Sequence, residues 1–116
     1  MKLVEDMIVT SGTISYSAPV QLGDANCAMY EVWVSALTGG GALTSTLEGS
    51  NDGVNWTAVV IKASPPTIST APAYVAYEPD HSASVVVISW TMLRLKFVLS
   101  AGTVLASASI RTFRSA

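Results

Sequence analysis

The feature that most constrains this chain is a turn signal set between two runs of alternating residues. The first run spans 43–49, the turn centres on Asn-Asp-Gly at 51–53, and the second run spans 56–62. Asn, Asp and Gly best tolerate the positive φ that tight hairpin turns require. Such a turn fixes strand register, and register decides which side chains face the core. The stretch therefore predicts an antiparallel β domain, with Trp56 entering the second strand as a large apolar anchor.

The same alternation continues along the chain. We expect further strands at 7–16, 20–22, 29–37, 84–90, 91–99 and 104–111, with a short edge piece at 74–77. A Ser-Ala-Gly turn at 100–102 predicts a second hairpin, between the last two runs. No stretch carries a helical apolar stripe. Seven or eight strands at this spacing favour one antiparallel β-sandwich of jelly-roll type over residues 1–116, with residues 1–10 as an N-terminal arm.

Two connections stand out between these strands. The glycine run at 39–41 follows Thr38 and predicts a flexible link, because it lacks the Lys-Ser/Thr that a phosphate-binding loop needs. The segment 63–83 carries four prolines, which exclude a central strand. A connection this long is often a functional or contact-making loop.

Charge is scarce and unevenly placed. Charged residues make up 12% of the chain, whereas an average soluble domain has about 25%. Either other subunits cover much of the surface, or a Ser/Thr-rich face simply meets water. Residues 1–82 hold all eight acids with two lysines, a formal charge of −6, and residues 83–116 hold four basic residues and no acid. These segments can pair within one sheet or steer copies together.

Several function classes are excluded or disfavoured. The single cysteine, Cys27, rules out an intrachain disulfide and a four-cysteine metal framework, and it fits a small buried apolar side chain. The acids at 5 and 6 disfavour a signal peptide, and the longest apolar run is too short to span a bilayer. The basic C-terminal segment is too sparse in charge and aromatics for nucleic-acid binding.

Catalysis and metal binding are also disfavoured. His81 lies beside Glu78, Asp80 and Ser82, but adjacent loop residues do not converge as a nucleophile, base and orienting group must. Oxygen ligands for Ca²⁺ at 78–81, at 24–26 and at 51–52 are more often turn side chains that bond their own backbone. We therefore expect no enzyme activity, no metal and no cofactor.

Of the three tryptophans, one is expected on the surface. Trp56 and Trp90 lie within predicted strands, where core packing is the usual role. Trp33 shares a strand face with Glu31 and Ser35, so it is expected to be exposed. An exposed tryptophan is either a ligand platform or an interface anchor.

Two short stretches resemble known protein families. Ser-Asn-Asp-Gly-Val-Asn-Trp-Thr at 50–57 resembles the Ser-Asn-Asp-Gly-x-x-Trp element of discoidin-like (F5/8 type C, galactose-binding-like) sandwiches. Met-Leu-Arg-Leu-Lys-Phe at 92–97 is similar to a later strand of those domains that carries an Arg between apolar residues. The turn element also recurs in small virion structural and head-decoration (cement) proteins of tailed bacteriophages. This chain is similar to them in size, in its few cysteines and in its Ala/Ser/Thr-rich face.

The resemblance implies two functions. The first is a capsid decoration protein of a virion, assembled in the host cytoplasm, which self-associates as a trimer and binds the major capsid protein. Contacts would come from the arm and the proline loop, and basic residues would complement an acidic neighbour. The interface candidates are Trp33, Arg94, Lys96, Arg111, Arg114, Pro65, Pro66, Tyr74 and Tyr77. The second function is a carbohydrate-binding module that uses Trp33 and the loop near 51–52.

Overall fold

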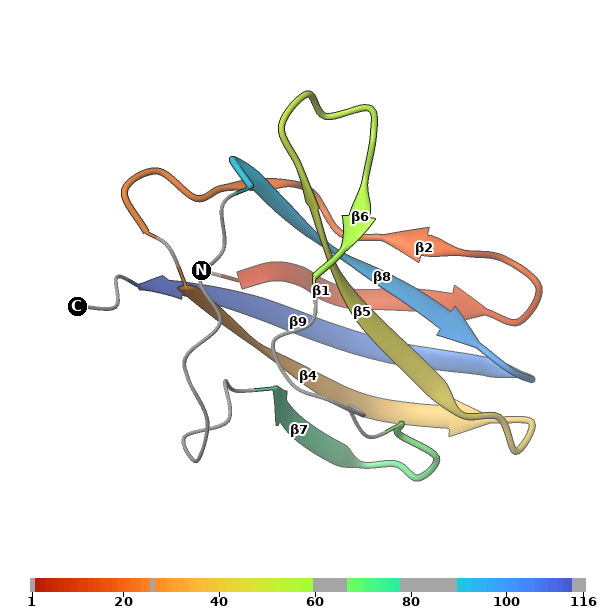
Figure 1. Cartoon of the computed structure of the whole chain (residues 1–116). Helices are drawn as coiled ribbons and strands as arrows, with labels where there is room; N and C mark the ends of the chain where they lie inside the picture. Colours follow the sequence, from red (N-terminus) through yellow and green to blue (C-terminus); the bar gives the residue numbers. More distant parts are fainter. Residues whose placement is uncertain (1, 26, 60–66, 78–89, 114–116) are drawn as a thin grey trace.

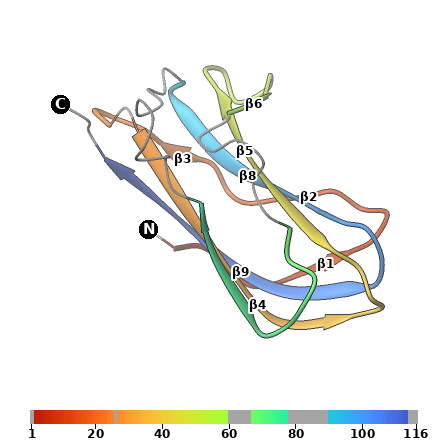
Figure 2. The ribbon, with the colours of Figure 1, turned by 60° about the horizontal axis from the view of Figure 1, so that its bottom comes forward.

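The computed structural model describes residues 2–25, 27–59, 67–77 and 90–113, and these residues form strands and turns. Two antiparallel sheets, A and B, pack face to face (Figures 1 and 2). The predicted antiparallel β-sandwich is confirmed. The described residues hold nine strands where seven or eight were expected, because three of them span only two residues. Within this part of the chain, no helix has the length and apolar character needed to cross a membrane.

Sheet A has the strand order β1-β9-β4-β7. Its strands are β1 (Lys2–Thr10), β9 (Thr103–Phe113), β4 (Cys27–Thr38) and β7 (Ala73–Tyr77). The short edge strand predicted at 74–77 is confirmed as β7. The predicted N-terminal arm is wrong, because the backbone from Lys2 onward pairs with β9. The first strand also ends earlier than predicted, at Thr10, where a turn carries the chain into sheet B.

Sheet B has the order β2-β8-β5-β6, and β3 also pairs with β8. Its strands are β2 (Ser15–Tyr16), β3 (Val20–Gln21), β8 (Met92–Leu99), β5 (Leu43–Ser50) and β6 (Thr57–Ala58). The hairpin around the Asn-Asp-Gly turn is confirmed, since Glu48 pairs with Ala58 and Gly49 with Thr57. The strand predicted at 84–90 falls mainly outside the described residues, and Trp90 precedes β8.

The second predicted hairpin is wrong. β8 lies in sheet B and β9 in sheet A, so the turn at 100–102 carries the chain between layers. A hairpin and a layer crossing bury the same alternate residues, which is why the apolar pattern did not distinguish them. The β4–β5 connection also crosses, and the two crossings touch: a Cβ built on Gly102 would overlap the carbonyl oxygen of Thr38. The glycine run predicted to be a flexible link is therefore packed against its neighbour.

The core lies between the sheets, where the sequence placed it. The inward residues of β8 and β9 are all buried as predicted: Leu93, Leu95, Phe97, Leu99, Val104, Ala106, Ala108 and Ile110. Tyr30 of sheet A spans the layers, and its hydroxyl donates to the carbonyl oxygen of Ser45 in sheet B at 3.3 Å. Each sheet therefore packs one face against the core and has its other face on the outside of the sandwich.

Candidate functional site

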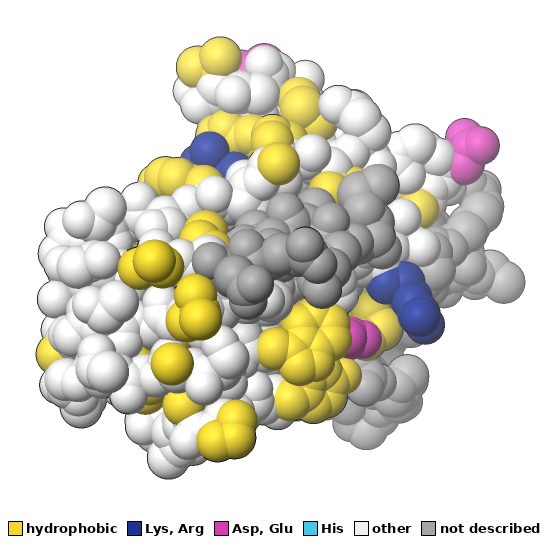
Figure 3. Space-filling view, turned by 180° about the vertical axis from the view of Figure 1, so that it is seen from behind, with side chains coloured by type: hydrophobic (Ala, Val, Ile, Leu, Met, Phe, Trp, Pro, Cys, Tyr) yellow, Lys and Arg dark blue, Asp and Glu magenta, His cyan; other side chains and the backbone are white. Residues whose placement is uncertain are grey.

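The outer face of sheet A, as far as its residues are described, is a candidate binding surface. Residues paired across neighbouring strands share a face, so the register assigns its members. We call this surface the A face; it comprises Ile8, Thr10, Met29, Glu31, Trp33, Ala36, Thr38, Tyr74, Ala76, Thr103, Leu105, Ser107, Ser109 and Arg111, with exposed Ser35 at the bulge between Val34 and Ala36. Glu31 and Arg111 are its only charged members among the described side chains. Figure 3 looks onto this side, where hydrophobic and uncharged polar side chains dominate.

An aromatic pair stands at the centre of the β4–β7 half of the A face. Trp33 and Tyr74 are register partners, and their ring centroids lie 5.5 Å apart with the planes inclined at 38°. Trp33 is 37% exposed and Tyr74 54% exposed, so both rings present surface outward. The exposure predicted for Trp33 is confirmed.

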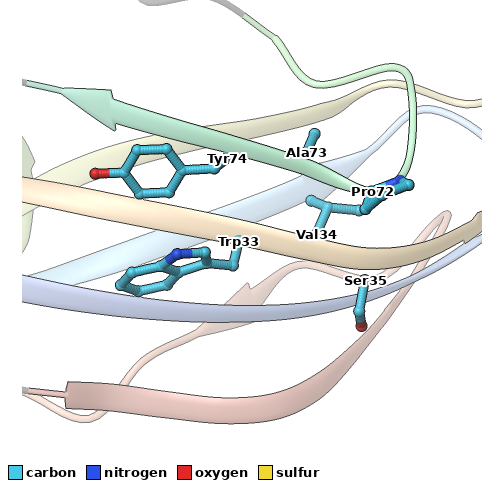
Figure 4. Close-up of a pocket in the computed structure, with 6 residues that line it drawn as sticks. All are labelled: Trp33, Val34, Ser35, Pro72, Ala73 and Tyr74. Atoms are coloured by element: carbon cyan, nitrogen blue, oxygen red, sulfur yellow. The ribbon is translucent and has the colours of Figure 1, made fainter.

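The aromatic pair borders a shallow hollow of about 460 Å³ (Figure 4). Its lining also includes Ser35 and Pro72, at the end where β7 begins. No charged side chain lines it. It suits a flat apolar group or a partner side chain.

The other predicted interface residues are dispersed. Arg111 lies on the A face, exposed, on β9. Arg94 and Lys96 point outward from β8 in sheet B, on the opposite side of the sandwich. Tyr77 is the last residue of β7, where its backbone pairs with Tyr30. Pro65, Pro66 and Arg114 lie outside the described residues. The basic residues whose positions are described therefore do not form one surface.

Arg94 is engaged within its own chain. Its guanidinium carbon lies 3.9 Å from the ring centroid of Tyr16 and 4.1 Å from that of Trp56. Its Nε donates to Oε1 of Glu48 at 2.8 Å, and its side chain is 19% exposed. Two aromatic faces and a carboxylate thus hold one cation in place across β2, β8 and β5.

The role predicted for Trp56 as a core anchor is wrong. The ring covers Arg94 on the outside of sheet B, and the indole nitrogen donates to the carbonyl oxygen of Gly53 at 3.2 Å. Strand β6 begins only at Thr57, so Trp56 belongs to the turn, and it is half-buried there. Trp90 is also half-buried and packs against the core, where a Cβ on Gly49 would collide with its ring.

Polar side chains of the Asn-Asp-Gly turn accept hydrogen bonds from the turn's own backbone. Oδ1 of Asp52 accepts from the backbone nitrogens of Val54 and Asn55, each at 2.8 Å. These bonds, with others from Asn55 and Ser50, hold the pKa of the Asp52 carboxyl well below its usual range. The predicted role of Asp52 as a turn side chain is confirmed. The residues described include no group of three His, Cys, Asp or Glu able to hold a metal; the cluster at 78–81 lies outside them.

The predicted carbohydrate site is divided by the fold. Trp33 lies on the outer face of sheet A, and the loop at 51–52 follows β5 in sheet B. The sequence indicated that Trp33 is exposed, but it did not indicate that Tyr74 is its cross-strand partner. The stack around Arg94 was missed as well. Alternation assigns a residue to a face, whereas pairing between distant strands is set by tertiary register.

Comparison with protein-family models, with curated proteins and with solved structures finds no match to this chain. The role of the A face must therefore be inferred from its own residues.

Proposed function

We propose that this protein is a non-enzymatic structural protein of a virion, a decoration or cement protein of bacteriophage type. It contacts copies of itself and coat subunits through the A face. The observation that carries this proposal is a broad sheet face with two exposed aromatic rings and two charges among its described side chains. Interface centres are enriched in Tyr and Trp and depleted in charge. The virion setting rests on the resemblance of the turn element at 50–57.

Burial of the aromatic pair would contribute substantially to the free energy of binding a partner. Trp33 and Tyr74 are 37% and 54% exposed, so covering both removes about 200 Å² of aromatic surface from water. At about 25 cal/mol per Å² this contributes about 5 kcal/mol before the entropy costs of association. Many copies bound at once on a particle surface add avidity to such a modest contact.

Co-sedimentation with coat shells tests the proposal. Shells assembled from the coat protein of the virus that encodes this chain should carry the wild-type chain into the pellet. The double variant Trp33→Ser/Tyr74→Ser should bind at least tenfold more weakly. The matched control Ile14→Ser/Val54→Ser removes exposed apolar side chains outside the A face and should bind as wild type does. Absence of wild-type binding, or equal loss in both variants, would contradict the proposal.

A carbohydrate-binding role is the second candidate, favoured by the Trp33–Tyr74 pair beside its hollow. Aromatic rings stack on the apolar face of a sugar, but a sugar site also needs several convergent polar groups. The polar groups among the lining residues are the Ser35 hydroxyl, the Tyr74 hydroxyl and the Trp33 indole N–H, with no carboxylate or amide side chain. Glycan binding by a monomer, lost in Trp33→Ser, would favour this candidate over assembly.

A further inference from the structure

We infer that the outer face of sheet B carries a binding site for an acidic segment of a partner protein, with Arg94 as its fixed anchor and Lys96 beside it. The site goes beyond the proposed function and does not depend on it, because these two residues lie on the opposite side of the sandwich from the A face. The way the guanidinium is held, the donors that it keeps available and the charge of sheet B each support it.

The guanidinium of Arg94 lies between two aromatic rings. Its central carbon is 3.9 Å from the ring centroid of Tyr16 and 4.1 Å from that of Trp56. Tyr16 belongs to β2 and Trp56 precedes β6, and these strands flank the β8–β5 pair on opposite sides (Figure 1). A guanidinium that is already ordered in this way loses little conformational entropy when it binds a ligand.

The outer edge of this guanidinium is available to a ligand. Nε donates to Oε1 of Glu48 at 2.8 Å, and this is the one hydrogen bond that Arg94 makes within the described part of the chain. No buried side-chain nitrogen or oxygen of the described residues lacks a partner, so the two Nη atoms of Arg94 must reach solvent. A pair of N–H groups at the edge of a planar guanidinium matches the two oxygens of a carboxylate.

Positive charge exceeds negative charge in sheet B. Its strands contain Arg94, Lys96 and a single acid, Glu48, which Arg94 already neutralises. Lys96 lies two residues, or about 7 Å, further along the same face of β8, and it forms no ion pair with a described residue. Acidic residues at alternate positions of an extended chain have the same spacing. One carboxylate can therefore meet Arg94 while the next meets Lys96.

The number of cations favours an acidic protein segment over a nucleic acid. Binding to a phosphate backbone depends on a patch or row of many cations. The strands of sheet B supply two, and the whole chain has a formal net charge of −2, which repels a polyanion. A short peptide with alternating glutamates carries only the two charges that the site can pair.

An NMR titration of the full-length chain with a blocked Gly-Glu-Gly-Glu-Gly peptide at low salt tests the site. The indole signal of Trp56, which covers Arg94, should shift and saturate, whereas that of Trp33 on the A face should not move. The same peptide with glutamine in place of glutamate should cause no shift. Salt at about 0.5 M should weaken binding at least fivefold, because it screens exposed charges.

Three variants assign the binding to these residues. Arg94→Lys keeps the charge but loses the paired donors, so it should raise the dissociation constant at least tenfold. Lys96→Gln should raise it at least threefold. Arg111→Gln, the matched control, removes one positive charge from the opposite side of the sandwich and should bind the peptide as the wild type does. Circular dichroism and urea unfolding establish that each variant is folded, and Lys96→Gln decides if Arg94→Lys is not.

Several results would overturn the inference. They are a wild-type chain that shows no saturable shift, equal shifts with the glutamate and glutamine peptides, and an unchanged dissociation constant in Arg94→Lys and Lys96→Gln. Inorganic phosphate or a single-stranded oligonucleotide that binds more tightly than the peptide would also overturn it. None of these results bears on the binding of coat shells through Trp33 and Tyr74, so the proposed function can fail or stand separately.

Discussion

Replacing Gly102 with alanine should lower the free energy of unfolding through two effects. One is the cost of a positive φ for a residue with a side chain, and the other is a steric overlap with neighbouring backbone. The φ of Gly102 is +78°, a conformation that costs a residue with a side chain about 1–2 kcal/mol. The new Cβ would also overlap the carbonyl oxygen of Thr38 and approach Cα of Gly39 to 2.8 Å. Both obstacles are backbone, so no rotamer change relieves them, and the overlap should add about 1–3 kcal/mol. We expect a total loss of about 2–5 kcal/mol in the free energy of unfolding.

Gly40→Ala is the matched control for this prediction. Gly40 lies in the neighbouring crossing with φ +70°, and a Cβ there meets no atom within 4 Å. Gly40→Ala should therefore lose only the cost of the positive φ, about 1–2 kcal/mol in the free energy of unfolding. Urea unfolding followed by tryptophan fluorescence measures both variants, and with a slope of about 1–3 kcal/mol per M the midpoints should differ by about 1 M. Equal midpoints for the two variants would show that the layer crossings are not packed against each other.

This contact bears on function because β9 is one of the strands that form the A face. If β9 paired with β8 as a hairpin, Ser107 and Arg111 would leave sheet A, and the A face would lose one of its strands. A variant that loosens the crossings should therefore weaken self-association as well as stability.

Three further predictions concern single contacts. Tyr30→Phe removes the hydroxyl that bonds to Ser45 across the layers and should cost about 1 kcal/mol in urea unfolding, with no change in association. Arg94→Met leaves Glu48 without its guanidinium and should cost about 1–3 kcal/mol by the same measurement, whereas Lys96→Met on the same face should cost little. The lowered pKa of Asp52 means that its carboxylate stabilises the turn at neutral pH and above about pH 4; this contribution is lost as pH falls through the lowered pKa. An NMR titration of the Asp52 carboxyl that gives an ordinary pKa would contradict the turn geometry.

Much of the fold follows from local pattern, and the site follows only in part. Alternation at 93–99 and 104–110 correctly assigned the core, and the face shared with Glu31 correctly assigned Trp33 to the surface. The same alternation fits a hairpin and a layer crossing equally well, so it could not predict which sheet β9 joins. Trp56 was misplaced because its hydrophobicity suggested the core, whereas a cation on a neighbouring strand holds it outside. Pairs such as Trp33–Tyr74 depend on the register of strands far apart in sequence.

The most direct test of the central claim is an NMR dilution series that follows the three tryptophan indole signals. Trp33 lies on the A face, while Trp56 covers Arg94 on sheet B and Trp90 packs against the core. If the A face is covered by another copy, the Trp33 indole signal should shift or broaden as concentration rises, and the other two should stay in place. A Trp33 signal that does not change up to the highest soluble concentration would contradict self-association through this face.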